Sequence, residues 1–241
     1  MRVKAVISYD GSQYQGFQKQ KSTKMTITAA IEEALASLQI SSPIVGSGRT
    51  DAGVHATGQV IHFDLPDFWN DLEKLQRNLN RKLTDISFKH ISFAANDFHA
   101  RFGAKKRLYR YVFKTHKPSV FEQKYISYYE AFDPSLLIKA LKTFEGKHDF
   151  NFFHKTGTIT HTTVREIYRT DYVERNGYHF IYFQANGFLR SQVRMMVDSA
   201  MLCARGELSE TQLQEQLKCQ TKHTTKLAPP EGLYLAKIIY G

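Results

Sequence analysis

A glycine-rich decapeptide limits what this chain can fold into more than any other stretch. Residues 46–55 read GSGRTDAGVH, with glycine at three of the first eight positions. Glycine loses more backbone entropy than other residues when a helix or strand fixes it, so this run predicts a loop. Apolar residues precede it at 44 and 45 and follow it at 60, 61 and 63. We therefore expect a polar loop between two buried strands, with the carboxylate of Asp51 at its tip.

The loop pattern alone leaves the role of Asp51 open. An aspartate in a glycine-rich loop is most often bonded to its own backbone in an Asx-turn. The alternative is a carboxylate presented for chemistry. Arg49, two residues earlier, is equally ambiguous, because it can brace the loop through an ion pair or act on a ligand.

Length and composition indicate a folded protein with a real core. The chain has 241 residues, of which 42% are hydrophobic, enough for one large or two small domains. No apolar run approaches a membrane span and the first residues lack a signal-peptide core, so we expect a cytoplasmic protein without a membrane partner. Two cysteines argue against a disulfide framework, and the ten histidines lack metal-ligand spacing. We expect no metal site.

The charge of the chain suggests a polyanionic partner. The formal net charge is +10, although a basic enzyme without such a partner is also common. Residues 101–117 carry seven lysines and arginines, four aromatic residues and no acid. Lysines at 19, 21 and 24 form a second cluster. Basic and aromatic side chains together suit phosphates and unstacked bases. A membrane surface would favour a basic amphipathic helix, whereas this segment alternates like a strand.

Hydrophobic periodicity predicts an α+β protein made of two halves, 1–97 and 98–241. In the first half we expect strands at 3–9 and 86–95, helices at 26–38 and 71–83, and two strands flanking the central loop. In the second half we expect strands at 107–115 and 124–130, a helix at 133–146, a hairpin of 164–174 and 178–185, helices at 188–204 and 210–217, and a last strand at 233–240. The hairpin turn is Asn176-Gly177, the strongest short hairpin signal. No flexible linker separates the halves, so we expect them to pack together.

Six motifs occur in one order along nearly the whole chain, and together they resemble the TruA family of tRNA pseudouridine synthases. The central loop continues into GQV at 58–60 and HF at 62–63. The other motifs are YDG at 9–11 with Tyr14 and GFQ at 16–18, the segment 99–111, HDF at 148–150, FLRSQVRMM at 188–196 and PEGLY at 230–234. Two positions depart from the family pattern: the family often has Trp where Phe17 stands and Gly where Asp198 stands.

The resemblance implies both a fold and an activity. The fold would be two packed α+β halves of the RNP or ferredoxin-like kind, sharing a mixed, mainly antiparallel sheet, with the active-site cleft between them. The enzyme would isomerise uridine to pseudouridine at positions 38–40, in the anticodon arm of tRNA, and would act as a homodimer with one tRNA spanning both subunits. The reaction breaks the C1′–N1 bond, rotates the uracil and rejoins it through C5. That chemistry needs no redox step, so we expect no cofactor.

The resemblance also implies roles for individual residues. Asp51 matches the catalytic aspartate, which acts as nucleophile. Arg49 matches the arginine that flips the target nucleotide. Tyr109, in the run RLYRY at 107–111, matches the active-site tyrosine that stacks on the uracil. The alternative for Tyr109 is packing, and Tyr111 points to the same side of the same strand, so only the resemblance chooses between them.

Arg194 matches the arginine that pairs with the catalytic aspartate. A cation this close to the apolar face of its predicted helix wants a buried partner. Asp198, four residues later, is the structural alternative for that partner. We interpret Arg190 as an RNA-contacting or surface residue. For the RNA footprint we expect Lys105, Arg107 and Arg110.

Two other functions stay open from the sequence. One is the same chemistry on a different RNA. The other is a non-catalytic RNA-binding module on this scaffold, which an eroded catalytic loop would favour; here Asp51, Tyr109 and Arg194 are all present. A zinc-dependent base deaminase is excluded, since the chain has no His-x-Glu with Cys-x-x-Cys.

Overall fold

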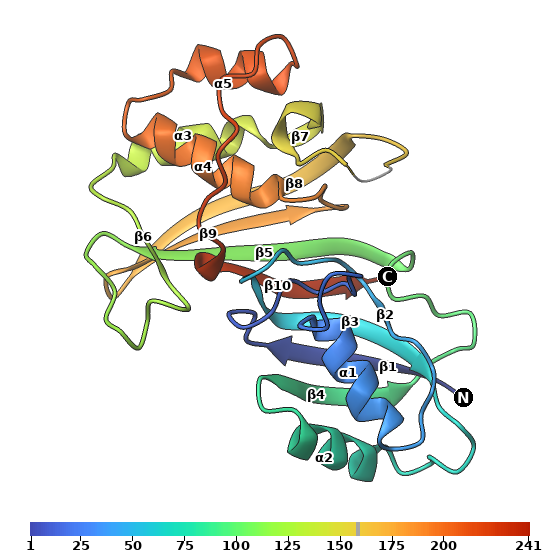
Figure 1. Cartoon of the computed structure of the whole chain (residues 1–241). Helices are drawn as coiled ribbons and strands as arrows, with labels where there is room; N and C mark the ends of the chain where they lie inside the picture. Colours follow the sequence, from blue (N-terminus) through green and yellow to red (C-terminus); the bar gives the residue numbers. More distant parts are fainter. Residues whose placement is uncertain (158–159) are drawn as a thin grey trace. The chain divides into compact units, whose positions relative to one another are not determined.

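The protein is α+β, with mixed, mainly antiparallel strand pairing, as expected (Figure 1). The computed structural model describes residues 1–157 and 160–241. Contacts divide the chain into unit 1, residues 1–105 with 234–241, and unit 2, residues 106–233. Within the described residues, no helix has the length and apolar character needed to cross a membrane.

Unit 1 is a sheet of four main strands with two helices. Its strand order is β4 (Ile86–Phe93), β1 (Arg2–Tyr9), β3 (His55–Asp64) and β10 (Leu233–Tyr240), with the short β2 (Val45–Gly46) also on β3. The pairings are antiparallel except that β10 runs parallel to β3, with Tyr234 opposite His55. Every second residue of β1 is buried, from Val3 to Tyr9. This alternation gives the sheet one face for the core.

The helices of unit 1 begin where their capping residues stand. In α1 (Ile27–Ala36) the side chain of Thr26 accepts the N–H of Ala29. In α2 (Leu72–Lys82) Asp71 caps in the same way, accepting the N–H of Lys74. Both caps satisfy backbone donors that the first helical turn leaves without partners.

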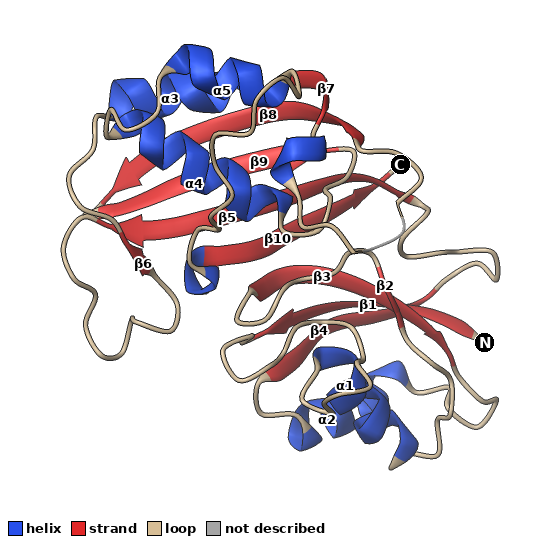
Figure 2. Ribbon diagram, turned by 45° about the horizontal axis from the view of Figure 1, so that its top comes forward, coloured by secondary structure: helices blue, strands red, loops and turns tan. Residues whose placement is uncertain are grey.

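Unit 2 is an antiparallel sheet with three helices. Its strand order is β5 (Ala104–Lys114), β9 (Tyr178–Ala185), β8 (Val164–Arg175) and β7 (Gly146–Asp149), with β6 (Ser127–Tyr128) parallel to the end of β5. The helices are α3 (Pro134–Thr143), α4 (Gln192–Ala204) and α5 (Glu210–Leu217), with short 3₁₀ turns η1 (Asn151–Phe153) and η2 (Pro230–Gly232). The helices gather on one side of these strands (Figure 2). The turn between β8 and β9 is confirmed, with positive φ at both Asn176 and Gly177.

Three elements of unit 2 differ from the sequence prediction. The strand expected at 124–130 shrinks to Ser127–Tyr128. The segment before this strand turns around Glu122. The carboxylate of Glu122 accepts hydrogen bonds from Lys114 at 2.6 Å and from the hydroxyl of Tyr178 at 2.7 Å. The helix expected from 188 starts only at Gln192, because Ser191 takes a left-handed φ of 60°. Strand β7 was not expected from the sequence.

The division of the chain by contacts also differs from the sequence-based boundary between residues 97 and 98. Unit 1 extends to Lys105, and the last eight residues return to it. The physical reason is the parallel pairing of β10 with β3. A pairing between strands so far apart in the chain leaves no local signal in the sequence.

A buried histidine should make unit 1 sensitive to acid. His62 is 5% exposed, and its Nδ1 accepts the N–H of Ala100 at 3.1 Å. Burial, aided by the positive charges of Arg2 and His99, lowers the pKa of His62 to about 4. Between pH 6.5 and 4 the unfolded chain therefore binds a proton that the folded chain does not, so stability falls as pH drops through this window.

We expect this one histidine to cost on the order of 2 to 3 kcal/mol of stability at the acid end of the window. Urea unfolding at pH 7 and pH 4.5 measures the loss. His62→Asn, which keeps an acceptor for Ala100, should lose less stability on acidification than the wild type. The exposed His116 supplies a control, His116→Asn. An identical pH dependence in wild type and His62→Asn would contradict the assignment.

Candidate active site

The central loop is clamped at its base by one buried amide. Ser47 donates its backbone N–H to the carbonyl of Val60 at 2.8 Å and its hydroxyl to Oε1 of Gln59 at 2.6 Å. The same amide donates from Nε2 to the carbonyl of Gly48 at 2.8 Å, and Gln59 is 0% exposed. A buried amide with donor and acceptor both used fixes its neighbours. The sequence signal for this clamp was the GQV motif, to which we assigned no role.

The opening motif wraps around the middle of the loop. The hydroxyls of Tyr9 and Thr50 share a buried hydrogen bond of 2.8 Å. Burial raises the pKa of Tyr9, so its hydroxyl keeps its proton. Phe17 donates its N–H to the carbonyl of Thr50 at 3.0 Å, and Gly53 donates to the carbonyl of Tyr14 at 3.3 Å. The residues on either side of Asp51 are therefore held by a segment distant in sequence.

Two glycines allow this close approach. A Cβ on Gly11 would lie 2.0 Å from the carbonyl oxygen of Val54, and a Cβ on Gly46 would lie 2.5 Å from the ring of Phe17. Real Cβ atoms do not come this close to other heavy atoms. The glycines at 11 and 46 thus serve contact between segments, rather than an unusual φ.

His55 joins the loop to the opening motif and to β10. It is 1% exposed, and its Nδ1 accepts the N–H of Gly11 at 3.1 Å. The same nitrogen lies 3.3 Å from a carboxylate oxygen of Asp10. The ring stacks on Tyr234 with centroids 4.8 Å apart. Three segments of unit 1 therefore meet at one imidazole just after the loop.

Asp51 lies at the tip of this braced loop and is partly exposed. The turn after it is closed by its own backbone carbonyl, which accepts the N–H of Val54 at 3.2 Å. An Asx-turn would use the N–H of Gly53, and that group donates to the carbonyl of Tyr14. The bonds of the turn thus come from backbone atoms. Arg49 stands two residues earlier with an exposed side chain.

Strand β5 carries the two tyrosines that the sequence left equivalent, and their surroundings differ. Tyr109, 7% exposed, sits opposite Phe183 in the sheet and meets Phe188 edge-on, with centroids 5.1 Å apart. Tyr111 is 0% exposed, and its hydroxyl, with one proton to donate, lies within hydrogen-bond distance of Ser127 Oγ at 2.8 Å and of the carbonyl oxygen of Pro229 at 3.0 Å. Burial raises its pKa well above the usual value. Tyr111 is therefore a core residue.

Removing the hydroxyl of Tyr111 should lower stability with little effect on chemistry. Tyr111→Phe leaves the carbonyl of Pro229 and the hydroxyl of Ser127 short of a buried donor. We expect a loss of about 1 to 2 kcal/mol in the free energy of unfolding, with turnover at 25 °C near that of the wild type. Denaturant unfolding and a single-turnover assay check this. Turnover of Tyr111→Phe far below that of the wild type would return Tyr111 to the list of active-site candidates.

Arg194 lies in the first turn of α4. Its Nε donates to the carbonyl of Ala228 at 2.7 Å, and its own carbonyl accepts the N–H of Ala228 at 3.1 Å. The first bond holds the guanidinium, and the second ties the backbone of Arg194 to the segment of Ala228. Burial raises the pKa of Asp198, and the charges that oppose this come from Lys226 and Arg205. Arg194 is not among the charges that act most on Asp198, and the identity of its acidic partner stays a prediction.

The basic residues expected to contact RNA are distributed along β5. Lys105 is exposed, while Arg107 and Arg110 are partly exposed. A guanidinium nitrogen of Arg107 donates to the carbonyl of Asn186 at 2.6 Å. In residues 1–157 and 160–241 no cluster of three or more His, Cys, Asp or Glu side chains could hold a metal ion.

The predicted site residues thus belong to two groups. Unit 1 contains Arg49 and Asp51, which share the braced loop, and also Lys105 on β5. Unit 2 contains Arg107, Tyr109, Arg110 and Arg194. Sequence reasoning missed the residues that position the loop. Gln59 and His55 stand inside the motifs already noted, but their roles depend on contacts with Gly48 and Gly11 that only the folded chain makes.

Comparison with known proteins shows the family of the chain. The family described as tRNA pseudouridine synthase matches residues 5–103 and 140–241. The chain is 41% identical to tRNA pseudouridine synthase A of Helicobacter hepaticus, covering 98% of each chain. It is 38% identical to the protein of that name from Campylobacter jejuni over 100% of each chain, and 39% identical to that of Listeria monocytogenes over 99% of each.

A solved archaeal box H/ACA Nop10–Cbf5 complex aligns with 83% of this chain and 43% of that one, at 10% identity and a TM-score of 0.38. That similarity is too low to support an inference. The match to the family description covers the aspartate loop of unit 1 and the helix of Arg194 in unit 2. With relatives of this identity over essentially the full length, the chain belongs to the TruA family of tRNA pseudouridine synthases and is an enzyme that isomerises uridine in tRNA.

Proposed function

We propose that this enzyme isomerises uridines at positions 38–40, in the anticodon arm of tRNA. The observation that most supports a catalytic function is the way in which the central loop is held. It keeps the full motif around Asp51, and buried hydrogen bonds from the opening motif hold it. A scaffold kept only for binding RNA has no need of such a rigid carboxylate, so the loop favours catalysis over the binding-module alternative.

Each residue has a separate task in the proposed mechanism. Asp51 acts as nucleophile toward the target nucleotide, which must leave the base stack to reach it. Arg194, whose guanidinium donates to the carbonyl of Ala228, pairs with Asp51 and favours its ionised form against desolvation. Tyr109 holds the detached uracil by stacking, with Phe188 behind it. Arg49, exposed on the loop, assists extrusion of the nucleotide.

Tritium release tests the reaction and its position together. Formation of the C1′–C5 bond expels the hydrogen at C5, so tRNA labelled at C5 of uridine must release tritium. We expect release from a transcript whose labelled uridines include positions 38–40, and none after those positions are changed to cytidine. Release that persists after the change would move the activity to another site or another RNA.

The basic residues of β5 should contribute electrostatic affinity. Replacing Lys105 and Arg107 by alanine together removes two charges that we assign to RNA phosphates. Each lost phosphate contact should flatten the slope of log affinity against log salt by about 0.7 to 0.9, so we expect a change of roughly 1.5 in total. Filter binding at several salt concentrations measures the slope. A matched pair of exposed lysines, Lys147 and Lys218, supplies the control double variant; equal slopes in the two would place the footprint elsewhere.

We further propose that the enzyme acts as a homodimer, with one tRNA in contact with both subunits. Sedimentation equilibrium tests the assembly. A second, catalytically inactive copy mixed with wild type tests whether one site needs its neighbour. A monomer with full activity would overturn this part of the proposal and leave the reaction assignment unchanged.

A further inference from the structure

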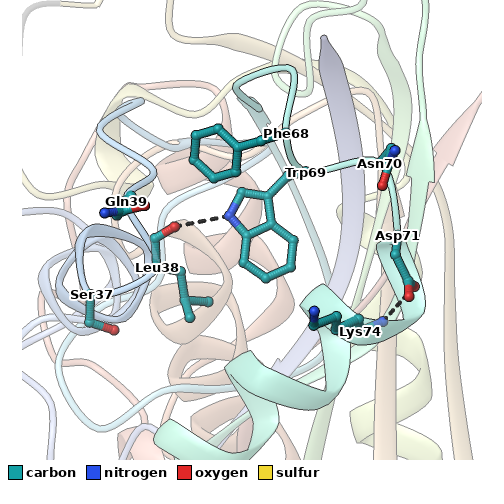
Figure 3. A pocket seen from close by; sticks show the side chains of 8 residues that line it. All are labelled: Ser37, Leu38, Gln39, Phe68, Trp69, Asn70, Asp71 and Lys74. Carbon is teal, nitrogen blue, oxygen red and sulfur yellow. Dashed lines mark hydrogen bonds between the residues drawn. The ribbon is translucent and has the colours of Figure 1, made fainter.

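Unit 1 has a recess away from the central loop, between the end of α1 and the start of α2 (Figure 3). Its volume is about 570 Å³, and residues 37–39 and 68–71 line it together with Lys74. This size is within the range of ordinary ligand sites. Trp69 forms its floor: the indole N–H donates to the carbonyl of Leu38 at 2.9 Å, which fixes the ring against the end of α1. Trp69 is thus part of the scaffold.

Phe68 has no comparable structural task. Its side chain is 61% exposed, with its ring centroid 6.4 Å from that of Trp69. The exposed amide side chains of Gln39 and Asn70 lie at the same recess. An open aromatic face beside amide donors and acceptors is what an unstacked nucleobase requires, stacking on one and hydrogen-bonding to the other.

A row of positive charge leads away from the recess along α2. Lys74, Arg77 and Arg81 are exposed and stand three and four residues apart, which places them on one face over about 10 Å. The pair of Arg77 with Glu73 spans 3.6 Å and is highly exposed, so it competes weakly with a phosphate. A carboxylate oxygen of Asp71 accepts the N–H of Lys74 in the helix cap. The row therefore complements a polyanion.

Helix α1 links this recess to the central loop. At its start, Ile27 donates to the carbonyl of Gly16 and Thr28 to that of Phe17, at 3.1 and 2.9 Å. These carbonyls belong to the opening motif that holds Thr50. The helix has ten residues, so its far end lies about 15 Å away. The recess and the loop therefore sit at the two ends of one rigid element of the same unit.

We propose that the recess takes an unpaired nucleotide of the tRNA substrate other than the uridine that reacts. The base lies against Phe68 beside the amides, and neighbouring backbone phosphates lie on Lys74, Arg77 and Arg81. The inference rests on tRNA being the substrate. Such a subsite contributes affinity and orientation, because it does not touch the reacting atoms. Losing it should raise KM and leave kcat unchanged.

The sequence supplies its own probe for this test. Trp69 is the single tryptophan of the chain, so fluorescence excited at wavelengths that tyrosine does not absorb reports on the recess. An unmodified tRNA transcript is titrated into Asp51→Ala protein, which removes turnover from the measurement. We expect quenching that saturates with the Kd obtained independently by filter binding. Uridine monophosphate is titrated separately, as the free-nucleotide arm.

Variants at Phe68 separate stacking from a structural effect. Phe68→Ala should weaken tRNA binding about tenfold, since stacking of one base on an aromatic ring is worth this much. Phe68→Tyr, which keeps the aromatic face, should bind as the wild type does. Phe93, 50% exposed on β4, supplies the control Phe93→Ala, which should bind unchanged. Lys74→Ala should flatten the salt slope by about 0.7 to 0.9, and Lys147→Ala should not.

The outcomes separate this inference from the proposed function. If tRNA binds without changing Trp69 fluorescence, and Phe68→Ala binds as Phe93→Ala does, the inference is wrong while tritium release can still establish the reaction. Quenching by uridine monophosphate alone, with tRNA affinity unaffected by Phe68→Ala, would make the recess a free-nucleotide site and also overturn it. Absence of tritium release from the wild type would instead overturn the proposed function.

Discussion

Asp51→Ala should reduce tritium release from tRNA by roughly 10³-fold or more, because the variant lacks the group that we assign as nucleophile. Its tRNA affinity should stay within a few-fold of wild type, since several bonds that hold the loop come from other residues. Those bonds are the Ser47–Gln59 contact and the backbone contacts of Thr50 and Gly53. Single-turnover release and filter binding measure the two quantities on the same preparation.

Two further variants make the result specific. Asp51→Asn keeps the size of the side chain and should lose activity to the same extent. Asp67→Ala removes an exposed acid elsewhere in unit 1 and should keep full activity. Release by Asp51→Ala at a rate near that of wild type would remove this residue from the catalytic role, and the nucleophile would have to be sought elsewhere.

Gly11→Ala should damage both stability and activity. The added methyl would meet the carbonyl oxygen of Val54 at 2.0 Å. That oxygen belongs to the backbone, so no side-chain rotation can move it away. Relief requires the opening motif to separate from the loop, which also removes the bond from Gly11 to His55. We expect a loss of about 3 kcal/mol or more in the free energy of unfolding.

Gly187→Ala is the matched control, because there the nearest atoms lie at 3.7 Å, an ordinary contact. It should change stability by less than about 1 kcal/mol. Denaturant unfolding compares the two variants, and tritium release measured well below the transition tests the loop. Wild-type stability of Gly11→Ala would contradict the close approach of Gly11 to Val54.

The sequence predicted what depends on neighbouring residues. The helical periods and the Asn176-Gly177 turn each act over a few residues. The structure confirms the turn and a helix at each predicted place, although α4 starts four residues later than expected. The motif around Asp51 was visible for the same reason. The choice between Tyr109 and Tyr111 was not, because residues two apart on a strand share a face and only their surroundings distinguish them.

What the sequence could not predict depends on contacts between distant segments. Gly11 was visible only as part of the YDG motif. Its partner Val54 follows α1 and β2 in the chain. Gln59 looked like part of a strand, although its side chain holds the base of the loop. Buried polar side chains find partners according to the fold, and no local pattern names those partners in advance.

The parallel pairing of β10 with β3 has a consequence for how the enzyme is made. Because the ribosome delivers the chain from its N-terminus, β3 and the loop before it emerge long before the strand that lies beside them. Until then His55 has no Tyr234 to stack on, and His55 and Ala56 of β3 lack the strand that pairs with them. A nascent chain therefore holds an incomplete catalytic half throughout synthesis, and a message cut short before β10 yields a product that cannot assemble it. Activity is in this way tied to completed translation.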